Sequence, residues 1–361
     1  MTKIERVLVM GAGPAGVAAA AALARRGFHA ILYNLPQFSS RMQPLIDRGG
    51  VEIEGSLGEE FVPIPVITTD IQEAMRDVQL ILIAVPAYRQ RLMVESCLPY
   101  LKPGHILLLL TGSCGTLEMA PILRQAGYSL DDILLGETVT MPQSARFVAD
   151  TKIRIRLPSL IRAAAFPGRN TERLVETIGD TLRLLPKPNV LDPGMNNPNF
   201  LIHPAPMLLN YAAVERAEGL LSIMNEGMTD GVLRLLDAVD AEKMALQQAL
   251  GLDVVPIDDL YREMGSGPHI YRVKGEPFDL KDKIHERYIK EDVPYGTVLY
   301  SAIGRAAGIP TPINDSITAI FSAVEQTDYW ALGRNAKNIG IDGLGREGLL
   351  HFMETGERPQ A

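Results

Sequence analysis

The sequence predicts an α/β protein in which a doubly wound parallel sheet domain is followed by a mostly α-helical domain. Three observations support this fold class. A short apolar run, Arg6–Met10, leads directly into a glycine-rich turn. Further continuous apolar runs alternate with helical patterns along the amino-terminal half, as in parallel sheets covered on both faces. The carboxyl-terminal half carries long helical patterns and few strand signals. The pattern changes from alternating strands and helices to long helices near Pro186. The predicted domains are therefore residues 1–187 and 188–361, with a substrate cleft between them.

Individual elements follow from apolar periodicity and stop signals. Continuous apolar runs of strand length predict strands at Arg6–Met10, His29–Tyr33, Leu80–Val85, Ile106–Leu110, Ile133–Val139 and Ile153–Leu157. Apolar residues at helical spacing predict helices at Thr171–Leu182, between Gly227 and Gly251, at Gly296–Ala307 and at Ile313–Val324.

Composition and charge exclude several functional classes. The chain has 361 residues, of which 47% are hydrophobic and 22% charged, as expected for a globular protein of about two domains. A formal net charge of −8 argues against nucleic-acid binding. No apolar run is long enough to span a membrane, and the first residues lead straight into a strand without signal-peptide features. The only cysteines, Cys97 and Cys114, exclude a disulfide framework and a thiolate metal site, so we expect a cytoplasmic protein without a metal.

The first chemical signal is the glycine loop Gly11-Ala-Gly13-Pro14-Ala15-Gly16 between a strand and an alanine-rich helix. This context matches the Rossmann dinucleotide-binding fingerprint. Gly11 would form the tight turn, Gly13 would let the backbone approach a pyrophosphate, and Gly16 would allow close helix–strand packing. Pro14 and Ala15 complete the loop. The helix N-terminus would favour the negative charge of the cofactor.

The end of the second predicted strand indicates the choice of cofactor. An NAD site expects Asp or Glu about 20 residues after the loop, but the strand ends at the neutral Asn34, and Arg41 follows in the next loop. Arg41 would pair with a 2′-phosphate, which favours NADP(H) and leaves NAD(H) as the alternative. Arg41 would otherwise be a solvated residue at the start of a helix. Val85 and Pro86, at the end of another strand, are expected to line the cofactor.

A candidate proton donor lies in the helical half. His203 stands between an Asn/Pro-rich loop and an apolar helix start, and histidine titrates in the range needed to reduce a carbonyl or imine. A carboxylate on its other ring nitrogen would fix the tautomer, and Asp315 is the candidate partner. From local features alone, a structural histidine and a helix-capping aspartate are the commoner interpretation.

Several blocks together resemble the octopine/nopaline (opine) dehydrogenase family across nearly the whole chain. They are the glycine loop, the Glu137-Thr-Val-Thr-Met-Pro142…Arg146 segment, the Ile202-His203-Pro204…Asn210 block and the Glu291-Asp-Val-Pro-Tyr-Gly296…Pro312…Asp315 block. The resemblance implies that an α-amino acid or amine condenses with a 2-oxo acid such as pyruvate, and that NAD(P)H reduces the imine to a secondary amine. It also implies that His203 transfers the proton and that Asp315 supports it.

Four further residues are predicted to bind substrate: Thr111, Glu137, Arg146 and Asn210. Thr111 follows a predicted strand, where ligands bind in open α/β sheets, although it would equally suit an ordinary turn. Glu137 would bind an ammonium group or cap a turn. Arg146 would pair with a carboxylate, unless it belongs to a solvated basic edge. A cysteine that some family members carry is absent from Gln143-Ser-Ala145, so arginine is not assumed as the amino substrate.

Two alternatives remain open at this point. A 2-dehydropantoate reductase-like or 6-phosphogluconate-type enzyme would reduce a substrate without an amine and would use a lysine, for which Lys243 and Lys290 are available. A non-catalytic NADP(H)-binding sensor would bind cofactor without turnover. Apolar helices of the second half would serve either as a homodimer interface or as internal core.

Overall fold

The computed structural model describes residues 4–360 except 157–159, 218–220, 222 and 266–283. The chain divides into two compact units, residues 1–194 and 195–361. The division lies seven residues after the boundary at 187/188 that the sequence predicts. No helix among the described residues has the length and apolar character needed to cross a membrane.

Unit 1 is built on an eight-stranded sheet with the strand order β12-β11-β8-β7-β6-β1-β2-β5. All neighbouring pairs are parallel except β8 and β11, which run antiparallel. Its strands are β1 (Arg6–Met10), β2 (His29–Tyr33), β5 (Val66–Thr68), β6 (Leu80–Ile83), β7 (Ile106–Leu109), β8 (Leu134–Thr138), β11 (Ile161–Ala165) and β12 (Leu184–Pro186). Residues of β6 and β7 are buried on both faces, because helices cover the sheet from both sides. The predicted α/β fold class is therefore confirmed.

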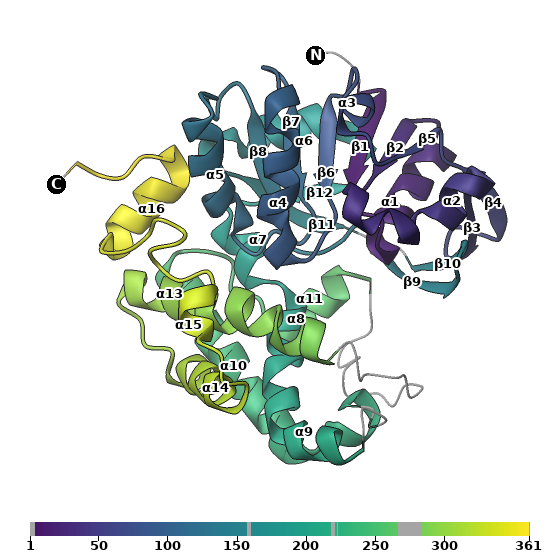
Figure 1. The fold of residues 1–361 in the computed structure, drawn as a ribbon. Helices are drawn as coiled ribbons and strands as arrows, with labels where there is room; N and C mark the ends of the chain where they lie inside the picture. Colours follow the sequence, from purple (N-terminus) through teal and green to yellow (C-terminus); the bar gives the residue numbers. More distant parts are fainter. Residues whose placement is uncertain (1–3, 157–159, 218–220, 222, 266–283, 361) are drawn as a thin grey trace. The chain divides into compact units, whose positions relative to one another are not determined.

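A second, four-stranded sheet has the order β4-β3-β10-β9. Its strands are β3 (Gly50–Gly55), β4 (Glu60–Pro63), β9 (Ser144–Ala149) and β10 (Lys152–Arg156). Figure 1 shows these strands grouped beside α1 at one end of the unit, away from α5. The inner face packs Ile153 and Ile155 of β10 into the same apolar cluster as Val17 and Leu23 of α1. The predicted strand Ile153–Leu157 thus belongs to a sheet that the sequence reasoning did not identify.

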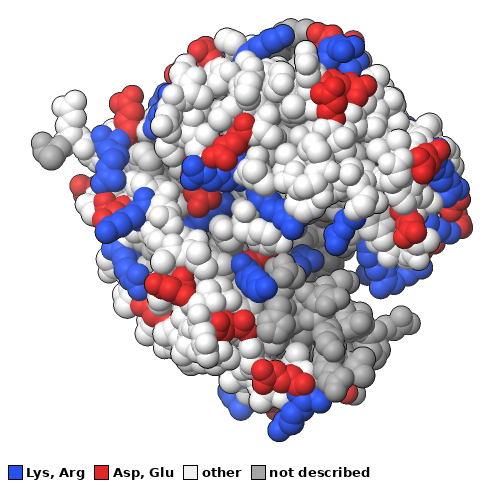
Figure 2. All heavy atoms as spheres, in the orientation of Figure 1, with Lys and Arg blue, Asp and Glu red and all other residues white. Residues whose placement is uncertain are grey.

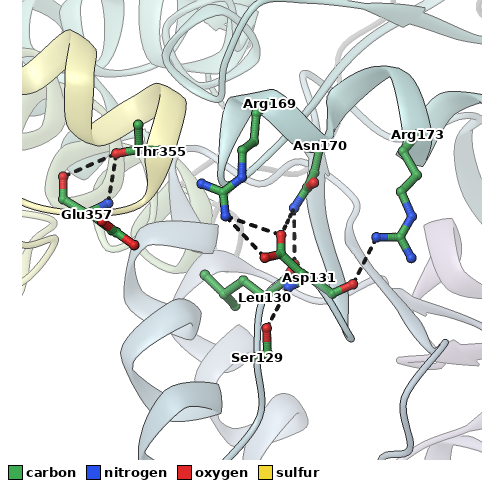
Figure 3. A network of polar contacts seen from close by, with 8 residues as sticks. All are labelled: Ser129, Leu130, Asp131, Arg169, Asn170, Arg173, Thr355 and Glu357. Atoms are coloured by element: carbon green, nitrogen blue, oxygen red, sulfur yellow. Dashed lines mark hydrogen bonds and ion pairs between the residues drawn. The ribbon is translucent and has the colours of Figure 1, made fainter.

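The helices of unit 1 are α1 (Pro14–Arg25), α2 (Gln43–Arg48), α3 (Ile71–Ala74), α4 (Ala87–Cys97), α5 (Gly115–Gln125), α6 (Thr171–Ile178) and α7 (Leu191–Met195). The start of α6 is tied to the loop before β8 by a polar network around Asp131 (Figure 3). Asn170 and Arg169 both donate to the Asp131 carboxylate, and Arg173 donates to its backbone carbonyl. The Asn170 hydrogen bond, helped by Arg169, lowers the pKa of Asp131. Helix α6 ends earlier than predicted because Gly179 adopts a positive φ of 51°.

The described residues of unit 2 form helices joined by turns, and no strands. Its helices are α8 (Pro198–Ile202), α9 (Pro204–Arg216), α10 (Asp230–Ala249), α11 (Ile257–Glu263), α13 (Val298–Ala307), α14 (Pro312–Val324), α15 (Tyr329–Leu332) and α16 (Gly345–Thr355). Helix α10 lies within the stretch that the spacing of Val232, Leu236 and Val239 predicts, and these three side chains are buried. Helices α13 and α14 meet at the break Gly308–Pro312, where Gly308 has a left-handed backbone.

Candidate functional site

The glycine loop has the backbone geometry that a dinucleotide requires. Gly11 has a φ of 121°, and a Cβ added there would lie 2.5 Å from the carbonyl oxygen of Ala84. A Cβ on Gly16 would lie 1.8 Å from the carbonyl oxygen of Gly11, so the helix packs directly on the turn. A Cβ on Gly13 would meet nothing within 4 Å. Gly13 is also the N-cap of α1, and no side chain caps this helix. The loop therefore presents an open, positively polarised helix start that fits a pyrophosphate.

The neighbouring strand ends carry the other residues expected to contact the cofactor. Val85 contacts the Gly11 turn, and Pro86 is the N-cap of α4. Asn34 at the end of β2 is nearly buried, and its Oδ1 accepts a hydrogen bond from the backbone N–H of Leu35. The exposed Arg41 ends the short helical turn Pro36–Arg41.

The same turn brings a second arginine to this edge, which the sequence reasoning missed. The Arg89 guanidinium, from the first turn of α4, lies 4.5 Å from the ring centroid of Phe38 and 5.5 Å from that of Tyr88. β1 leads into the glycine loop and lies between β2 and β6 in the sheet. Phe38 follows β2 and Arg89 follows β6, so this stack joins the two segments that lie on either side of the loop. A guanidinium held by aromatic rings at this position is a further candidate for phosphate recognition.

The loop after β7 has a strained backbone. Thr111, Ser113 and Cys114 all have positive φ values of 63°, 54° and 59°. This conformation is costly for residues other than glycine, above all for the β-branched Thr111, and such strain gathers at functional sites. The Thr111 backbone is fixed on both sides, because its N–H donates to Thr138 Oγ1 and its carbonyl accepts from Gln90.

The buried Glu137 side chain accepts hydrogen bonds from this loop. This finding corrects the predicted role of Glu137 as a substrate-binding residue. Its side chain has no exposed surface. Oε1 accepts from the Cys114 backbone N–H at 2.7 Å, and Oε2 accepts from both the backbone N–H and the hydroxyl of Thr116. Gly112 lies directly against the Glu137 side chain, where any Cβ would clash. Since both carboxylate oxygens already accept hydrogen bonds inside the protein, Glu137 stabilises the strained turn, the alternative that the sequence left open.

In unit 2, His203 is paired with Asp292. The imidazole Nδ1 lies 2.6 Å from Asp292 Oδ2, and the two side chains are only 6% and 2% exposed. His203 occupies the break between α8 and α9, and Pro204 starts the second helix. Asp292 is the N-cap of the helical segment Val293–Thr297. The ring of Tyr288 stacks on the imidazole, with the centroids 3.8 Å apart and the planes 14° from parallel. These contacts fix the ring and leave Nε2 as the nitrogen available for proton transfer.

The predicted pairing of His203 with Asp315 is therefore wrong. Asp315 lies in the first turn of α14 with its side chain 40% exposed, and its carboxylate lies 3.5 Å from Arg305. It also accepts a long hydrogen bond from the Thr311 hydroxyl. Asp315 is an acidic residue in the first turn of a helix whose N-cap is Thr311, so the structure does not bear out the alternative of a capping aspartate either.

Burial shifts both members of the pair away from their ordinary pKa values. Desolvation lowers the pKa of His203 well below its usual value, and the nearby Arg287 lowers it further. Desolvation raises the pKa of Asp292 to about 7, against the opposing effect of Arg287. Because the two groups share a short hydrogen bond, they titrate as a pair. Such shifts at a buried, specifically hydrogen-bonded pair are typical of functional sites.

The remaining predicted substrate residues have other contacts. Asn210 on α9 donates its side-chain N–H groups to the carbonyls of Pro206 and Gly227, so it ties the helix to the segment Ile223–Gly227. Its contact with substrate stays a prediction. Arg146 lies on the exposed outer face of β9, beside Arg154 and Arg156.

The two lysines considered for the alternative reductases have different surroundings. Lys243 is fully buried, and its ammonium lies 2.7 Å from Asp240 and donates to the Val255 carbonyl at 2.6 Å. Lys290 has an exposed side chain. Asp292, in contrast, stands in the Glu-Asp-Val-Pro-Tyr-Gly block that the sequence resemblance singled out, and that block was the signal that could have identified it.

Known protein families resemble both halves of this chain. The family model of the NAD/NADP octopine/nopaline dehydrogenase α-helical domain matches residues 186–325, and the ketopantoate reductase PanE/ApbA model matches residues 7–144. The chain is 30% identical to an opine dehydrogenase from Arthrobacter sp. (strain 1C), over 98% of this chain and all of that protein. It is 22% identical to vitopine synthase from Allorhizobium ampelinum, over 94% and 96% of the two chains.

Two solved structures share the fold. Octopine dehydrogenase with NADH and L-arginine superposes with a TM-score of 0.70 at 17% identity, covering 99% of each chain. Yersinopine dehydrogenase bound to NADP⁺ gives a TM-score of 0.66 at 14% identity, covering 98% of each chain. With a relative 30% identical along its whole length and a family-specific helical domain, this chain belongs to the octopine/nopaline (opine) dehydrogenase family of NAD(P)-dependent oxidoreductases.

Proposed function

We propose that the protein joins an α-amino acid or amine to a 2-oxo acid such as pyruvate and reduces the resulting imine with NAD(P)H, and that it also catalyses the reverse oxidation. The observation that carries this proposal is the buried His203–Asp292 pair, with Nδ1 2.6 Å from the carboxylate. It stands in a chain 30% identical to an opine dehydrogenase over almost its full length. The product is a secondary amine bearing at least two carboxylates when the amine donor is an amino acid.

The overall reaction defines what the protein must do with protons. An ammonium group, a 2-oxo acid, NAD(P)H and one proton give a secondary ammonium, NAD(P)⁺ and water. The amine nitrogen must lose a proton before it attacks the carbonyl carbon, and the carbinolamine oxygen must gain one before it leaves as water. A single imidazole nitrogen that first accepts and then donates a proton serves both steps. We assign this role to Nε2 of His203.

Asp292 and Tyr288 position that nitrogen. With Asp292 ionised, Nδ1–H donates to the carboxylate and Nε2 keeps a lone pair, which is the tautomer of a general base. The carboxylate also stabilises the imidazolium that forms when Nε2 takes a proton. The Tyr288 ring prevents the imidazole from tilting out of this orientation. The arrangement therefore compensates for the burial that otherwise disfavours a charged histidine.

The bound nicotinamide cofactor supplies the hydride. Gly11, Gly13, Pro14, Ala15 and Gly16 form the loop that would hold its pyrophosphate, since Gly13 faces open space at an uncapped helix start. Val85 and Pro86 would line the same edge, and the strained Thr111 turn would flank the nicotinamide end. This chain's part is to bind and orient the cofactor with backbone donors.

Within this activity we propose a preference for NADP(H). The end of β2 carries the neutral Asn34 instead of the acid expected for a ribose 2′-OH. Arg41 and Arg89 both lie at the turn Pro36–Arg41, the latter through its stack on Phe38. These two guanidinium groups, together with the neutral Asn34, favour a 2′-phosphate.

We also propose a cytoplasmic homodimer. The two cysteines form no disulfide, as suits a reducing compartment. Neighbouring helices α9 and α14 expose Leu209, Ile320 and Val324, which are 54%, 47% and 46% accessible, and a second copy would cover them. Light scattering on the purified protein tests the dimer.

The decisive experiment is an NADPH-consumption screen over pairs of amines and 2-oxo acids, with mass spectrometry of the product. We expect oxidation only when both substrates are present, and a product mass equal to amine plus 2-oxo acid minus one oxygen. Oxidation with a 2-oxo acid alone would assign the protein to the 2-oxo acid reductases instead. Tight NADPH binding without turnover for any pair would indicate a cofactor-binding sensor.

A further inference from the structure

The outer face of the four-stranded sheet carries a group of arginines that the proposed reaction does not use. In β9 and β10, Arg146 is paired directly with Arg154, and Ser144 with Arg156. Residues directly opposite one another share a face, and residues two apart along a strand do so as well. The three guanidinium groups therefore project from one side of the β9–β10 ribbon, while Ile153 and Ile155 face the core. Figure 2 shows Lys and Arg side chains gathered where β9 and β10 lie in Figure 1.

On this face the acidic Glu54 comes from β3, whereas the arginines come from β9 and β10. On β3, Glu54 lies beside Arg154, and its two carboxylate oxygens contact the Arg154 Nε and, at 3.1 Å, the Lys152 Nζ. These two cations lower the pKa of Glu54, with Arg154 the larger cause. Lys152 lies 3.0 Å from Glu59 as well. Among the described residues, no acidic side chain forms an ion pair with Arg146 or Arg156.

Two like charges directly opposite each other destabilise an antiparallel pair, because their Cβ atoms are only about 5 Å apart. Glu54 on β3 offsets the charge of Arg154, but Arg146 has no such acid among the described residues, so an anion beside Arg146 would reduce the repulsion that remains. The structure provides space for one: Ser144, Ala145, Arg146, Arg154 and Arg156 line a hollow of about 160 Å³. That volume equals about five water molecules at roughly 30 Å³ each. None of the described residues that line it is acidic.

We propose that this hollow is a binding site for a phosphate or phosphomonoester dianion. Guanidinium groups approach from both strands, so a tetrahedral group with three terminal oxygens can accept hydrogen bonds from several of them at once, and its charge offsets the arginine excess. The Ser144 hydroxyl lies on the same face and can donate one more. A single carboxylate has one charge and two oxygens, so it would satisfy fewer of these donors. The phosphate comes either from the free ion or from the 2′-phosphate of NADP(H), and in the second case this hollow, instead of Arg41 and Arg89, recognises that group.

Calorimetric titration of the full-length protein with inorganic phosphate, at constant ionic strength and without substrates, tests the site. We expect one phosphate per chain, and at least a tenfold weaker affinity in the double variant R146A/R156A. The matched control is R91A/R262A, which removes the same charge from two exposed arginines, each paired with an acid on its own helix. Undetectable phosphate binding, or equal weakening in both double variants, would overturn the proposal.

Thermal unfolding gives an independent readout. In phosphate-free buffer of low ionic strength, R146A should unfold at a higher temperature than the wild type, because the opposed charge has gone. Added phosphate should raise the unfolding temperature of the wild type more than that of R146A. An unchanged or lower unfolding temperature of R146A in both buffers would contradict the site.

Titration with NADP⁺ and NAD⁺ distinguishes the sources. Weakened NADP⁺ binding alone in R146A/R156A identifies the cofactor phosphate, and unchanged binding of both cofactors identifies a free phosphate. If the variant instead loses only affinity for the 2-oxo acid, and the wild type binds no phosphate, Arg146 is a substrate residue and this proposal fails. Because phosphate binding is measured without turnover, these outcomes do not depend on the proposed reaction.

Discussion

His203 Nδ1 lies 2.6 Å from Asp292 Oδ2, although 88 residues separate the two along the chain and both side chains are buried. The hydrogen bond commits one imidazole nitrogen to the acid and leaves the other for chemistry. Substitutions of the two residues should therefore have distinguishable effects, because His203 would transfer the proton and Asp292 would orient and stabilise the ring.

Replacing His203 by alanine should lower kcat by about 10²-fold or more, because the proton-transfer group is lost. The affinity for NADPH, measured by fluorescence titration, should stay near that of the wild type, since the glycine loop is unchanged. His351→Ala, on the exposed surface of α16, is the control. Near-wild-type turnover in H203A would remove this residue from the chemistry.

The two candidate acids should behave differently. Asp292→Asn keeps the size of the side chain but removes its charge, so kcat should fall by about 10²-fold as the imidazole loses its orienting carboxylate. Asp315→Asn removes only an exposed helix-terminal charge, whose contribution is about 0.3–1 kcal/mol of stability, and should leave kcat near the wild-type value. The reverse order of effects in steady-state assays would restore Asp315 as the functional partner.

The pair also predicts a pH signature in stability. Between about pH 4 and 6.5 the unfolded chain holds one proton on His203, and the folded chain holds one on Asp292, because burial raises the Asp292 pKa to about 7 and lowers that of His203. The folded and unfolded chains then bind the same number of protons at this pair. The pair therefore contributes little pH dependence to the free energy of unfolding in this range.

In Asp292→Asn the folded chain loses the proton on residue 292 that balanced the His203 proton of the unfolded chain. The unfolded His203 still binds a proton below its usual pKa of 6.5, while the buried imidazole does not, so stability is lost as the pH falls through 6.5. The slope relative to the wild type should approach about 1.4 kcal/mol per pH unit, the value for one proton. Urea unfolding at several pH values measures this slope, and parallel curves for both proteins would refute the assignment.

Substitutions at two glycines of the fingerprint should affect different properties, one the affinity for the cofactor and the other the stability of the fold. Gly13→Ala places a methyl group in open space, so the unfolding temperature should hold while NADPH affinity falls at least about tenfold, or 1.4 kcal/mol. Gly16→Ala forces its Cβ against the Gly11 carbonyl, so the unfolding temperature itself should drop. Thermal unfolding and cofactor titration on both variants test this. Unchanged NADPH affinity in G13A would place the pyrophosphate elsewhere.

Arg89 and Arg41 should decide cofactor preference. In R89A and R41A, affinity for 2′,5′-ADP should fall by about 10- to 100-fold, the loss expected for a charge-assisted hydrogen bond, while affinity for 5′-AMP should change little. Arg91→Ala, on the same helix as Arg89 and paired with Glu95, is the matched control. Equal loss of both nucleotides in R89A would show that the guanidinium stacks on the adenine instead of reading the phosphate.

Much of unit 1 was predictable because its signals are local. The apolar runs of β1, β2, β6 and β7 are buried on both faces, and a continuous run of strand length has few other ways to be buried. The glycine spacing likewise reports steric limits within a few residues of chain. The second sheet was missed because β9 is almost wholly exposed and therefore lacks an apolar pattern.

The sequence by itself determined the fold class and the cofactor fingerprint, because both depend on patterns within short segments, and its resemblance to a family singled out His203 as a candidate. Only the tertiary structure decided which acid pairs with that histidine, since Asp292 is buried against His203 while Asp315 is exposed beside Arg305. It also turned Glu137 inward to hold the strained Thr111 turn and brought Arg146 against Arg154. Hydrogen bonding and charge repulsion act through space over a few ångströms, so partners distant in sequence are fixed only when the chain has folded.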